Sequence, residues 1–187
     1  MDSQNQKDFI LWGTLSDLTI CDKLLNYYNN AKDKGPGKIG IGVDKNKKDS
    51  TDTYLEGSLK EEYLENLQQV CDLYINKFSF CNYYSPWKIL EPINIQHYSP
   101  NGGYKVWHCE RSLPHAPFSQ RHLVFMTYLN DVTDGGETEW FYQNLKLAPK
   151  KGLTVLWPAD WTHTHKGVVS PTQDKYIVTG WYSFYNA

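Results

Sequence analysis

The run His122-Leu123-Val124-Phe125-Met126-Thr127-Tyr128-Leu129-Asn130 is one of six short apolar and aromatic segments that follow Tyr84. The other five span residues 90–98, 139–147, 153–157, 162–169 and 175–184, and turns that contain Pro, Gly or Asn separate them. β-Branched and aromatic side chains pack well on a pleated surface, so we expect each segment to be a strand. Strands this short and this closely spaced predict a barrel or a sandwich.

The first 84 residues have a different pattern. Apolar residues at helical spacing predict helices over residues 16–34 and 61–78, with Ser16 as the N-cap of the first. Residues 35–53 between them are rich in Gly and Lys and are expected to form a mobile loop. A chain of 187 residues suits one domain. We therefore expect a single mainly β domain (α+β) over residues 1–187, in which residues 1–84 support a strand core formed by residues 85–187.

The composition argues against several classes of function. The chain has 19 basic and 21 acidic residues and a net charge of −2, so it lacks the electrostatic footprint of a nucleic-acid-binding protein. No apolar run is long enough to span a membrane, and the polar residues 1–7 do not resemble a signal peptide. The four cysteines are scattered without a Cys-x-x-Cys pair, which favours a reducing, cytoplasmic compartment.

His108 and Glu110 are separated by one residue. Side chains alternate faces along a strand, so an extended segment here would aim one imidazole and one carboxylate at the same point. A histidine from another strand would complete a face of two His and one carboxylate, which is the arrangement of non-heme Fe(II) oxygenases. Zinc accepts the same donors, so the triad alone does not choose the metal. Taken by itself, the pair also fits a surface strand with two polar residues.

His163 and His165 are the candidates for the third ligand. They share one face of the predicted strand at 162–169, so one could bind a metal while the other lines the pocket; two half-exposed histidines at an edge are the simpler alternative. Lys175 opens the last strand and could direct its charge at a carboxylate cosubstrate, although a lysine at a strand end is commonly solvated. Gly135 and Gly136 permit positive φ in a turn before a strand.

Six motifs keep their order and spacing along the C-terminal half of the chain. They are Tyr98 before a Gly-rich turn, His108-Cys109-Glu110, Tyr128-Leu129-Asn130, Gly135-Gly136-Glu137-Thr138, His165-Lys166-Gly167, and Lys175-Tyr176 leading to Trp181. This series resembles the 2-oxoglutarate- and Fe(II)-dependent dioxygenases, and among them the prolyl 4-hydroxylase-like enzymes, which include small versions from bacteria and phages. The resemblance covers residues 91–184 and is specific because six separate signals agree.

The resemblance implies a double-stranded β-helix, a distorted jelly roll of cupin-like type, buttressed by N-terminal helices. It implies that His108, Glu110 and His165 coordinate Fe(II). His165 is preferred to His163 because His-Lys-Gly and the ten-residue step to Lys175 both fit the family. The family also implies a set of contacts to 2-oxoglutarate: Lys175 on the distal carboxylate, Tyr98 as a hydrogen-bond donor, and Thr127, Thr179 and Trp181 as weaker candidates for the pocket.

The implied reaction is hydroxylation of a C–H bond, with Fe(II) as the metal, 2-oxoglutarate and O2 as cosubstrates, and ascorbate as an optional reductant. The first substrate to expect is a prolyl residue in a peptide or protein, and a small molecule is the alternative. We expect no nucleic-acid or membrane partner and a cytoplasmic location, which would be the host cytoplasm if a phage encodes the chain. The sequence does not indicate an oligomeric state.

Glu110 departs from the family, which usually has Asp at this position. Glu is longer by one methylene, so its backbone must lie further from the metal or its rotamer must fold, while a carboxylate oxygen remains the donor. Two alternatives remain open, and the departure at Glu110 favours the second of them. One is a cupin-like metalloenzyme that uses zinc or iron without 2-oxoglutarate, and the other is a non-catalytic jelly-roll binding module.

Overall fold

The computed structural model describes residues 5–40 and 42–185, and a large antiparallel sheet forms its centre. The strands of this sheet lie in the order β1 (Gln6–Lys7), β2 (Ile10–Thr14), β12 (Leu153–Pro158), β9 (Arg121–Tyr128), β14 (Lys175–Phe184), β7 (Ile93–Tyr98), β5 (Thr51–Leu55) and β3 (Gly35–Pro36), and β6 (Trp87–Ile89) pairs with β14. A second sheet has the order β11 (Leu145–Leu147), β10 (Thr138–Trp140) and β13 (His165–Gly167), and β4 (Lys48–Asp49) pairs with β8 (Gly103–Tyr104).

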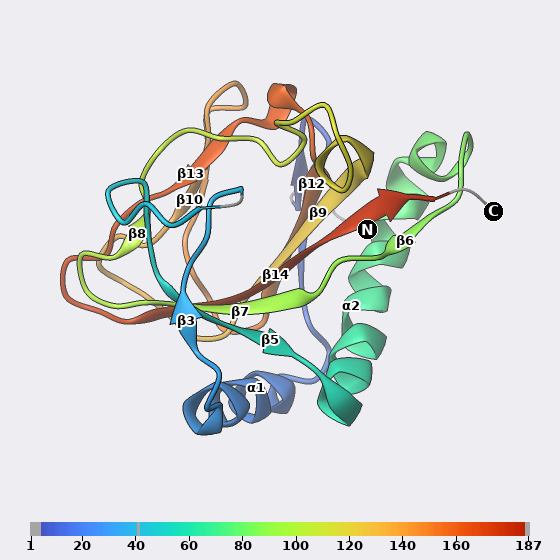
Figure 1. Ribbon diagram of the computed structural model, residues 1–187. Helices are drawn as coiled ribbons and strands as arrows, with labels where there is room; N and C mark the ends of the chain where they lie inside the picture. Colours follow the sequence, from blue (N-terminus) through green and yellow to red (C-terminus); the bar gives the residue numbers. More distant parts are fainter. Residues whose placement is uncertain (1–4, 41, 186–187) are drawn as a thin grey trace.

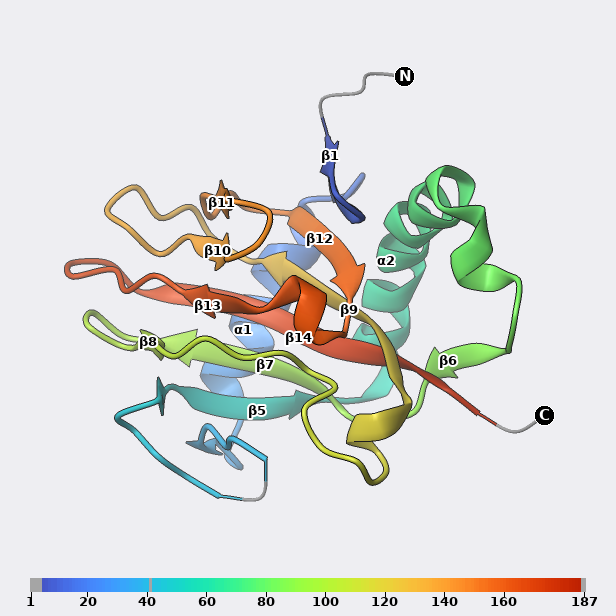
Figure 2. The ribbon, with the colours of Figure 1, turned by 90° about the horizontal axis from the view of Figure 1, so that it is seen from above.

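The two helices cover one face of the large sheet. Helix α1 (Thr19–Asn30) and helix α2 (Gly57–Lys77) lie on the side opposite to β10 and β13, as Figures 1 and 2 show from two directions. The large sheet is therefore the middle layer, with helices on one side and the small sheet on the other. This is the predicted double-stranded β-helix supported by helices.

Strand β9 shows why the apolar segments of this chain are continuous rather than alternating. Leu123 and Phe125 belong to the core between the large sheet and the helices. Val124, Met126 and Tyr128 belong to a second core between the two sheets. Because successive side chains of a strand point to opposite faces, a strand buried on both faces needs apolar residues at nearly every position.

Several predicted boundaries differ from the structure. The first helix begins at Thr19 and its N-cap is Leu18, so Ser16 is not the cap. Asp17 fixes this end instead, because its Oδ1 accepts hydrogen bonds from the backbone N–H and the hydroxyl of Thr19. The second helix begins at Gly57, earlier than predicted, and Phe78 is its C-cap.

Two predicted strands are also shorter than expected. Residues 139–147 form a hairpin of β10 and β11 rather than one strand, because Asn144 adopts positive φ in the turn between them. Residues 162–169 hold only the short β13, and His163 lies in a 3-10 turn that spans Trp161–His163. The N-terminal half contributes β1 to β5 to the sheets, so it does more than support them with helices.

The predicted mobile loop at residues 35–53 is largely structured. It contains β3, β4 and the start of β5, while Ile41 and residues 1–4 lie outside the described part of the chain. Lys48 is buried and pairs with Asp52 at 2.8 Å. In addition, the backbone N–H of Gly37 donates to Ser50 at 2.9 Å. These contacts hold the segment against β5, which in turn pairs with β7. In the described residues, no helix has the length and apolar character needed to cross a membrane.

Candidate metal centre and cosubstrate pocket

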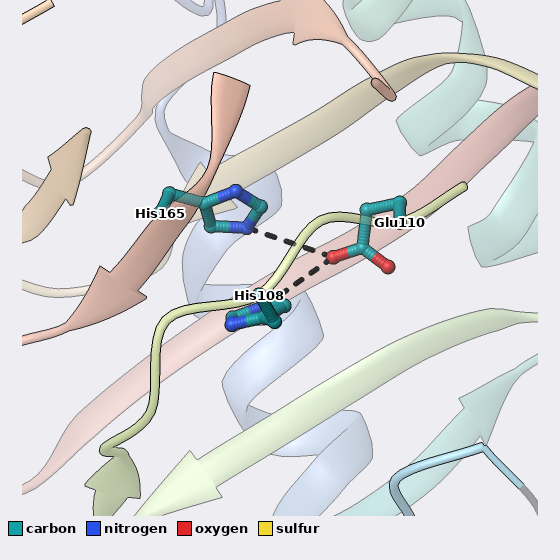
Figure 3. A group of neighbouring side chains, drawn as sticks. All are labelled: His108, Glu110 and His165. Carbon is teal, nitrogen blue, oxygen red and sulfur yellow. Dashed lines mark ion pairs between the residues drawn. The ribbon is translucent and has the colours of Figure 1, made fainter. Parts of the chain in front are cut away.

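His108, Glu110 and His165 converge on one point from distant parts of the chain. Figure 3 shows the two imidazoles and the carboxylate pointing toward one another. Oε1 of Glu110 lies 3.5 Å from Nε2 of His108 and 3.6 Å from Nε2 of His165. One donor atom from each residue falls within 4.8 Å of the others. The donors are two imidazole nitrogens and one carboxylate oxygen, a set that binds Fe(II) or Zn²⁺.

Backbone pairing brings the two histidines together. His108 and His165 form an isolated antiparallel β-bridge in which each N–H donates to the other carbonyl at 2.9 Å. The backbone N–H of Glu110 donates to Ala159 at 3.1 Å, which places the carboxylate beside the bridge. The expectation of an extended segment at residues 108–110 thus holds for His108, although the segment makes only this single bridge.

Each imidazole is oriented for binding through Nε2. Nδ1 of His108 lies 3.0 Å from the carbonyl of Val106, and Nδ1 of His165 lies 2.9 Å from the carbonyl of His163. A carbonyl oxygen can only accept, so both bonds require the proton on Nδ1 and leave a lone pair on Nε2. Backbone partners of this kind are usual for metal-binding histidines, because they fix the tautomer and the ring plane.

Aromatic residues pack against both rings. Tyr104 stacks on His108 with ring centroids 3.5 Å apart and planes tilted by 8°. Trp157 meets His165 edge-on at 5.1 Å, and Trp140 lies 6.2 Å from the same ring. The rotamers of the two imidazoles are therefore held by packing as well as by hydrogen bonds.

The electrostatics of the triad suit a cation. Burial alone would raise the pKa of Glu110, but His108 and His165, which attract the ionised carboxylate when they are protonated, outweigh burial and hold the pKa well below its usual range. Burial lowers the pKa of His108, and the nearby His165 lowers it further. An ionised carboxylate beside a neutral imidazole is the protonation state that a metal requires.

A cavity of about 420 Å³ opens beside the triad and reaches Lys175. Lys175 is buried, and its Nζ donates to the carbonyl of Gly136 at 3.0 Å. Burial lowers the pKa of Lys175 to about 8. Within residues 5–40 and 42–185, no carboxylate lies at ion-pair distance from this ammonium, so its charge is free to pair with an anionic ligand.

The turn at Gly135 and Gly136 holds Lys175 at this end of the cavity. The two glycines have φ of 76° and 80°, as predicted. A Cβ on Gly135 would lie 2.4 Å from the carbonyl oxygen of Val169. The turn therefore depends on glycine to bring the Gly136 carbonyl to Lys175.

Three of the predicted cosubstrate residues line the cavity together with Lys175. Tyr98, Thr179 and Trp181 all face it, but their polar groups differ. The hydroxyl of Tyr98 donates to Oε1 of Gln96 at 2.7 Å, and the hydroxyl of Thr179 donates to the carbonyl of Phe125 at 2.9 Å. Lys175 Nζ lies 5.0 Å from the centre of the Tyr98 ring, so Tyr98 also forms the wall beside the ammonium.

Thr127 and His163 are not brought to the site. The Thr127 hydroxyl lies 2.9 Å from the hydroxyl of Tyr63 on α2, on the helix side of β9, and it is Met126 that lines the cavity. Nε2 of His163 lies 2.8 Å from the carbonyl of Asp8. The two histidines do not share a face, because the 3-10 turn breaks the predicted strand between them.

Three residues of the cavity were not predicted from the sequence: Tyr104, Glu91 and Arg121. Arg121 lies 3.3 Å from Oε2 of Glu110. Tyr104 precedes His108 by four residues in an irregular segment, so no periodicity points to it. Contact between Arg121 and Glu110 depends on how the ten residues between them fold back, and the sequence carries no signal for that.

The residues present fit Fe(II) and 2-oxoglutarate. The triad supplies three donors on one side, and Lys175 supplies a buried cation at the other end of the same cavity. Trp157 and Trp181 also line this cavity, and in the described part of the chain the indole N–H of each is buried without a hydrogen-bond partner. Such orphaned donors are uncommon in proteins and suit a ligand that brings acceptors.

Comparisons with known proteins agree with this arrangement. Residues 93–183 match the family model of the 2OG-Fe(II) oxygenase superfamily. The sequence matches no curated protein. Fe(II) and 2-oxoglutarate are the metal and cosubstrate typical of this superfamily.

Solved structures of prolyl hydroxylases are similar in fold. A prolyl-4-hydroxylase from Pseudomonas putida aligns with a TM-score of 0.70 at 15% identity and covers 95% of this chain and 93% of its own. The viral collagen prolyl hydroxylase of Paramecium bursaria Chlorella virus-1, in complex with 2-oxoglutarate, gives 0.67 at 18% identity, with coverage of 95% and 97%. A Trichoplax adhaerens prolyl hydroxylase with a hypoxia inducible factor peptide fragment gives 0.71 at 18% identity, with coverage of 95% and 84%.

Proposed function

Since this chain belongs to the 2OG-Fe(II) oxygenase superfamily, we propose that it hydroxylates a C–H bond of a prolyl residue in a peptide or protein. The observation that carries this proposal is the placement of the triad and the buried Lys175 in one cavity. A cupin-like enzyme without 2-oxoglutarate has no need of an unpaired ammonium at that position.

In this proposal His108, Glu110 and His165 bind Fe(II) through Nε2, Oε1 and Nε2. Bound Fe(II) supplies the activation of O2 that couples decarboxylation of 2-oxoglutarate to succinate with hydroxylation of the substrate. The protein's part is to position the reactants and to exclude water. The aromatic rings of Tyr104, Trp140 and Trp157 around the two histidines serve that purpose.

Lys175 pairs with the distal carboxylate of 2-oxoglutarate. The Gly136 carbonyl holds Nζ in place before the ligand arrives, and the Tyr98 ring walls one side. Tyr98 already donates its hydroxyl proton to Gln96, so a bond from Tyr98 to the cosubstrate requires that contact to break. We therefore assign the charge recognition to Lys175 and the shape of the pocket to Tyr98 and Thr179.

Trp181 lies at the other end of the cavity and is proposed to face the substrate. It is six residues from Lys175 on β14, roughly 20 Å along an extended strand, and Arg121, which contacts Glu110, lies against its ring. The Arg121 guanidinium lies over the Trp181 ring at 3.6 Å and over the Phe118 ring at 4.6 Å. Flat aromatic walls are a common means of binding proline, and the similar solved structures include prolyl hydroxylases.

Residues 35, 36 and 38–40 also line this cavity. We propose that this segment borders the bound peptide. A lid that closes on the substrate would have to release the buried Lys48–Asp52 pair or move together with it.

Mass spectrometry of a panel of proline-containing peptides, with succinate measured in parallel, tests the proposed function. The wild-type protein with Fe(II) and 2-oxoglutarate is expected to form succinate and to add one oxygen atom to at least one peptide, while His165→Ala does neither. Succinate without any hydroxylated peptide would reject the prolyl substrate and retain the oxygenase. No succinate under any condition would favour the binding module or an enzyme that does not use 2-oxoglutarate.

A further inference from the structure

The two oxygens of Glu110 have separate partners. Oε1 faces the two histidines at 3.5 and 3.6 Å. Oε2 lies 3.3 Å from one terminal nitrogen of Arg121, and the same nitrogen donates to the backbone carbonyl of Glu110 at 3.2 Å. Arg121 therefore contacts both ends of the Glu110 residue, and only one carboxylate oxygen is left for a metal.

Arg121 is itself held on every side. Its Nε and its second terminal nitrogen donate to the two oxygens of Glu91 at 2.8 and 2.5 Å, the paired geometry in which arginine binds carboxylates most strongly. The guanidinium lies over the rings of both Trp181 and Phe118, at 3.6 and 4.6 Å from their centres. Arg121 is 6% exposed, so these contacts form inside the protein rather than on its surface.

We propose that Glu91 and Arg121 are positioning residues that hold Glu110 as a ligand through Oε1 alone. Glutamate has one more rotatable bond than aspartate, so an unrestrained Glu110 would present either oxygen, or both, to the metal. Fixing Oε2 removes that freedom, so Glu110 would not take up a second coordination position on a bound metal. The proposal rests on the proposed function in that it takes His108, Glu110 and His165 as the metal ligands.

Glu91 has a distinct role in this arrangement. Its negative charge balances Arg121, so the guanidinium does not place an uncompensated positive charge beside the cation site. Without Glu91, Arg121 would compete with the metal for Glu110, because charges interact strongly where water is excluded. Loss of either residue is therefore expected to weaken metal binding. Loss of Arg121 would free the Glu110 carboxylate to move, and loss of Glu91 would leave the positive charge of Arg121 to repel the metal.

The test is Mn²⁺ binding to the full chain, measured as free ion by electron paramagnetic resonance without 2-oxoglutarate. Removing partners that orient metal ligands typically lowers metal affinity 10–100-fold. We expect a loss of about tenfold or more in Glu91→Gln and in Arg121→Met. Lys151→Met is the control, because it breaks the surface pair with Asp22 far from the site and is expected to leave Mn²⁺ affinity unchanged.

A second background separates positioning from a structural role. Aspartate at position 110 is too short to reach Arg121, so Arg121→Met is expected to cost less than threefold in a Glu110→Asp protein. An equal loss in both backgrounds would show that Arg121 acts only on the fold and would overturn the proposal. If Arg121→Met does not fold, the near-isosteric Glu91→Gln is compared in the two backgrounds instead.

The outcomes also distinguish this inference from the proposed function. A wild-type protein that binds no Mn²⁺ would reject the metal site itself. If the wild-type protein binds Mn²⁺ and Glu91→Gln and Arg121→Met bind it equally well, the metal site stands and the positioning role of Glu91 and Arg121 is rejected.

Discussion

Lys175 is the residue whose environment most clearly requires a ligand. Its ammonium is buried and has only the Gly136 carbonyl as a hydrogen-bond partner among the described residues. A hydrogen bond to a charged group is worth about 1.5–3 kcal/mol. Lys175→Ala is therefore expected to weaken 2-oxoglutarate binding by roughly tenfold to a hundredfold, measured by anaerobic calorimetric titration. Lys151→Ala, a surface change, should leave the affinity unaltered, and an unaltered affinity in Lys175→Ala would refute its role.

The same residue predicts a dependence on pH. Burial lowers the pKa of Lys175 to about 8, below the ordinary value of 10.5. The charged form is needed to pair with a carboxylate, so affinity for 2-oxoglutarate is expected to fall as the pH rises above about 8. Arginine stays charged throughout this range, so Lys175→Arg should remove the decline at whatever affinity it retains. A flat profile in the wild-type protein would contradict the assignment.

The stability of the fold should respond with the opposite sign. Because the folded-state pKa of Lys175 lies below its ordinary value, the unfolded chain binds more protons between these two values. The cost of burying the ammonium is therefore fully present below pH 8 and is relieved as the pH rises toward 10.5. Burial of the charged Lys175 therefore lowers the stability of the free protein, and a bound carboxylate would offset that cost.

Among the elements, the turn before β10 is the one that most clearly requires a glycine. Gly135 has φ of 76°, and a Cβ there would lie 2.4 Å from a backbone oxygen. Gly135→Ala is expected to lower the free energy of unfolding by about 1–3 kcal/mol, measured in urea. Gly35→Ala is the control, since a Cβ at Gly35 meets nothing within 4 Å and its φ is not in the left-handed region. Equal losses in the two variants would contradict this account of the turn.

Strand elements also show what the sequence can and cannot predict. Lys175, Thr179 and Trp181 lie at alternate positions of β14, so one face of one strand brought all three predicted residues to the cavity. Thr127 lies on the helix-facing side of β9, a strand that is buried on both sides. A continuously apolar strand has no polar alternation that distinguishes its two faces. Which residues of β9 face the helices is decided only when α2 packs against the strand.

At the scale of the whole molecule, the general architecture followed from the strand pattern, whereas the parts that depend on distant pairing did not. Strand β2 joins the large sheet beside β12, more than a hundred residues away, and β5 joins it beside β7. Neither strand is signalled by local periodicity. Arg121 and Glu91 escaped prediction for the same reason, because a lone charged residue at a strand end looks like any solvated one until the fold buries it.

The convergence of residues 108, 110 and 165 is likewise a property of the whole fold, and it is the claim on which the function depends. An anaerobic titration of Fe(II) into the protein with 2-oxoglutarate, followed by absorbance, tests it most directly. The wild-type protein and His163→Gln are expected to develop the visible charge-transfer band of a chelated Fe(II) complex, while His108→Ala and His165→Ala should not. A band that persists in both alanine variants, or one that disappears only in His163→Gln, would contradict the proposed metal site.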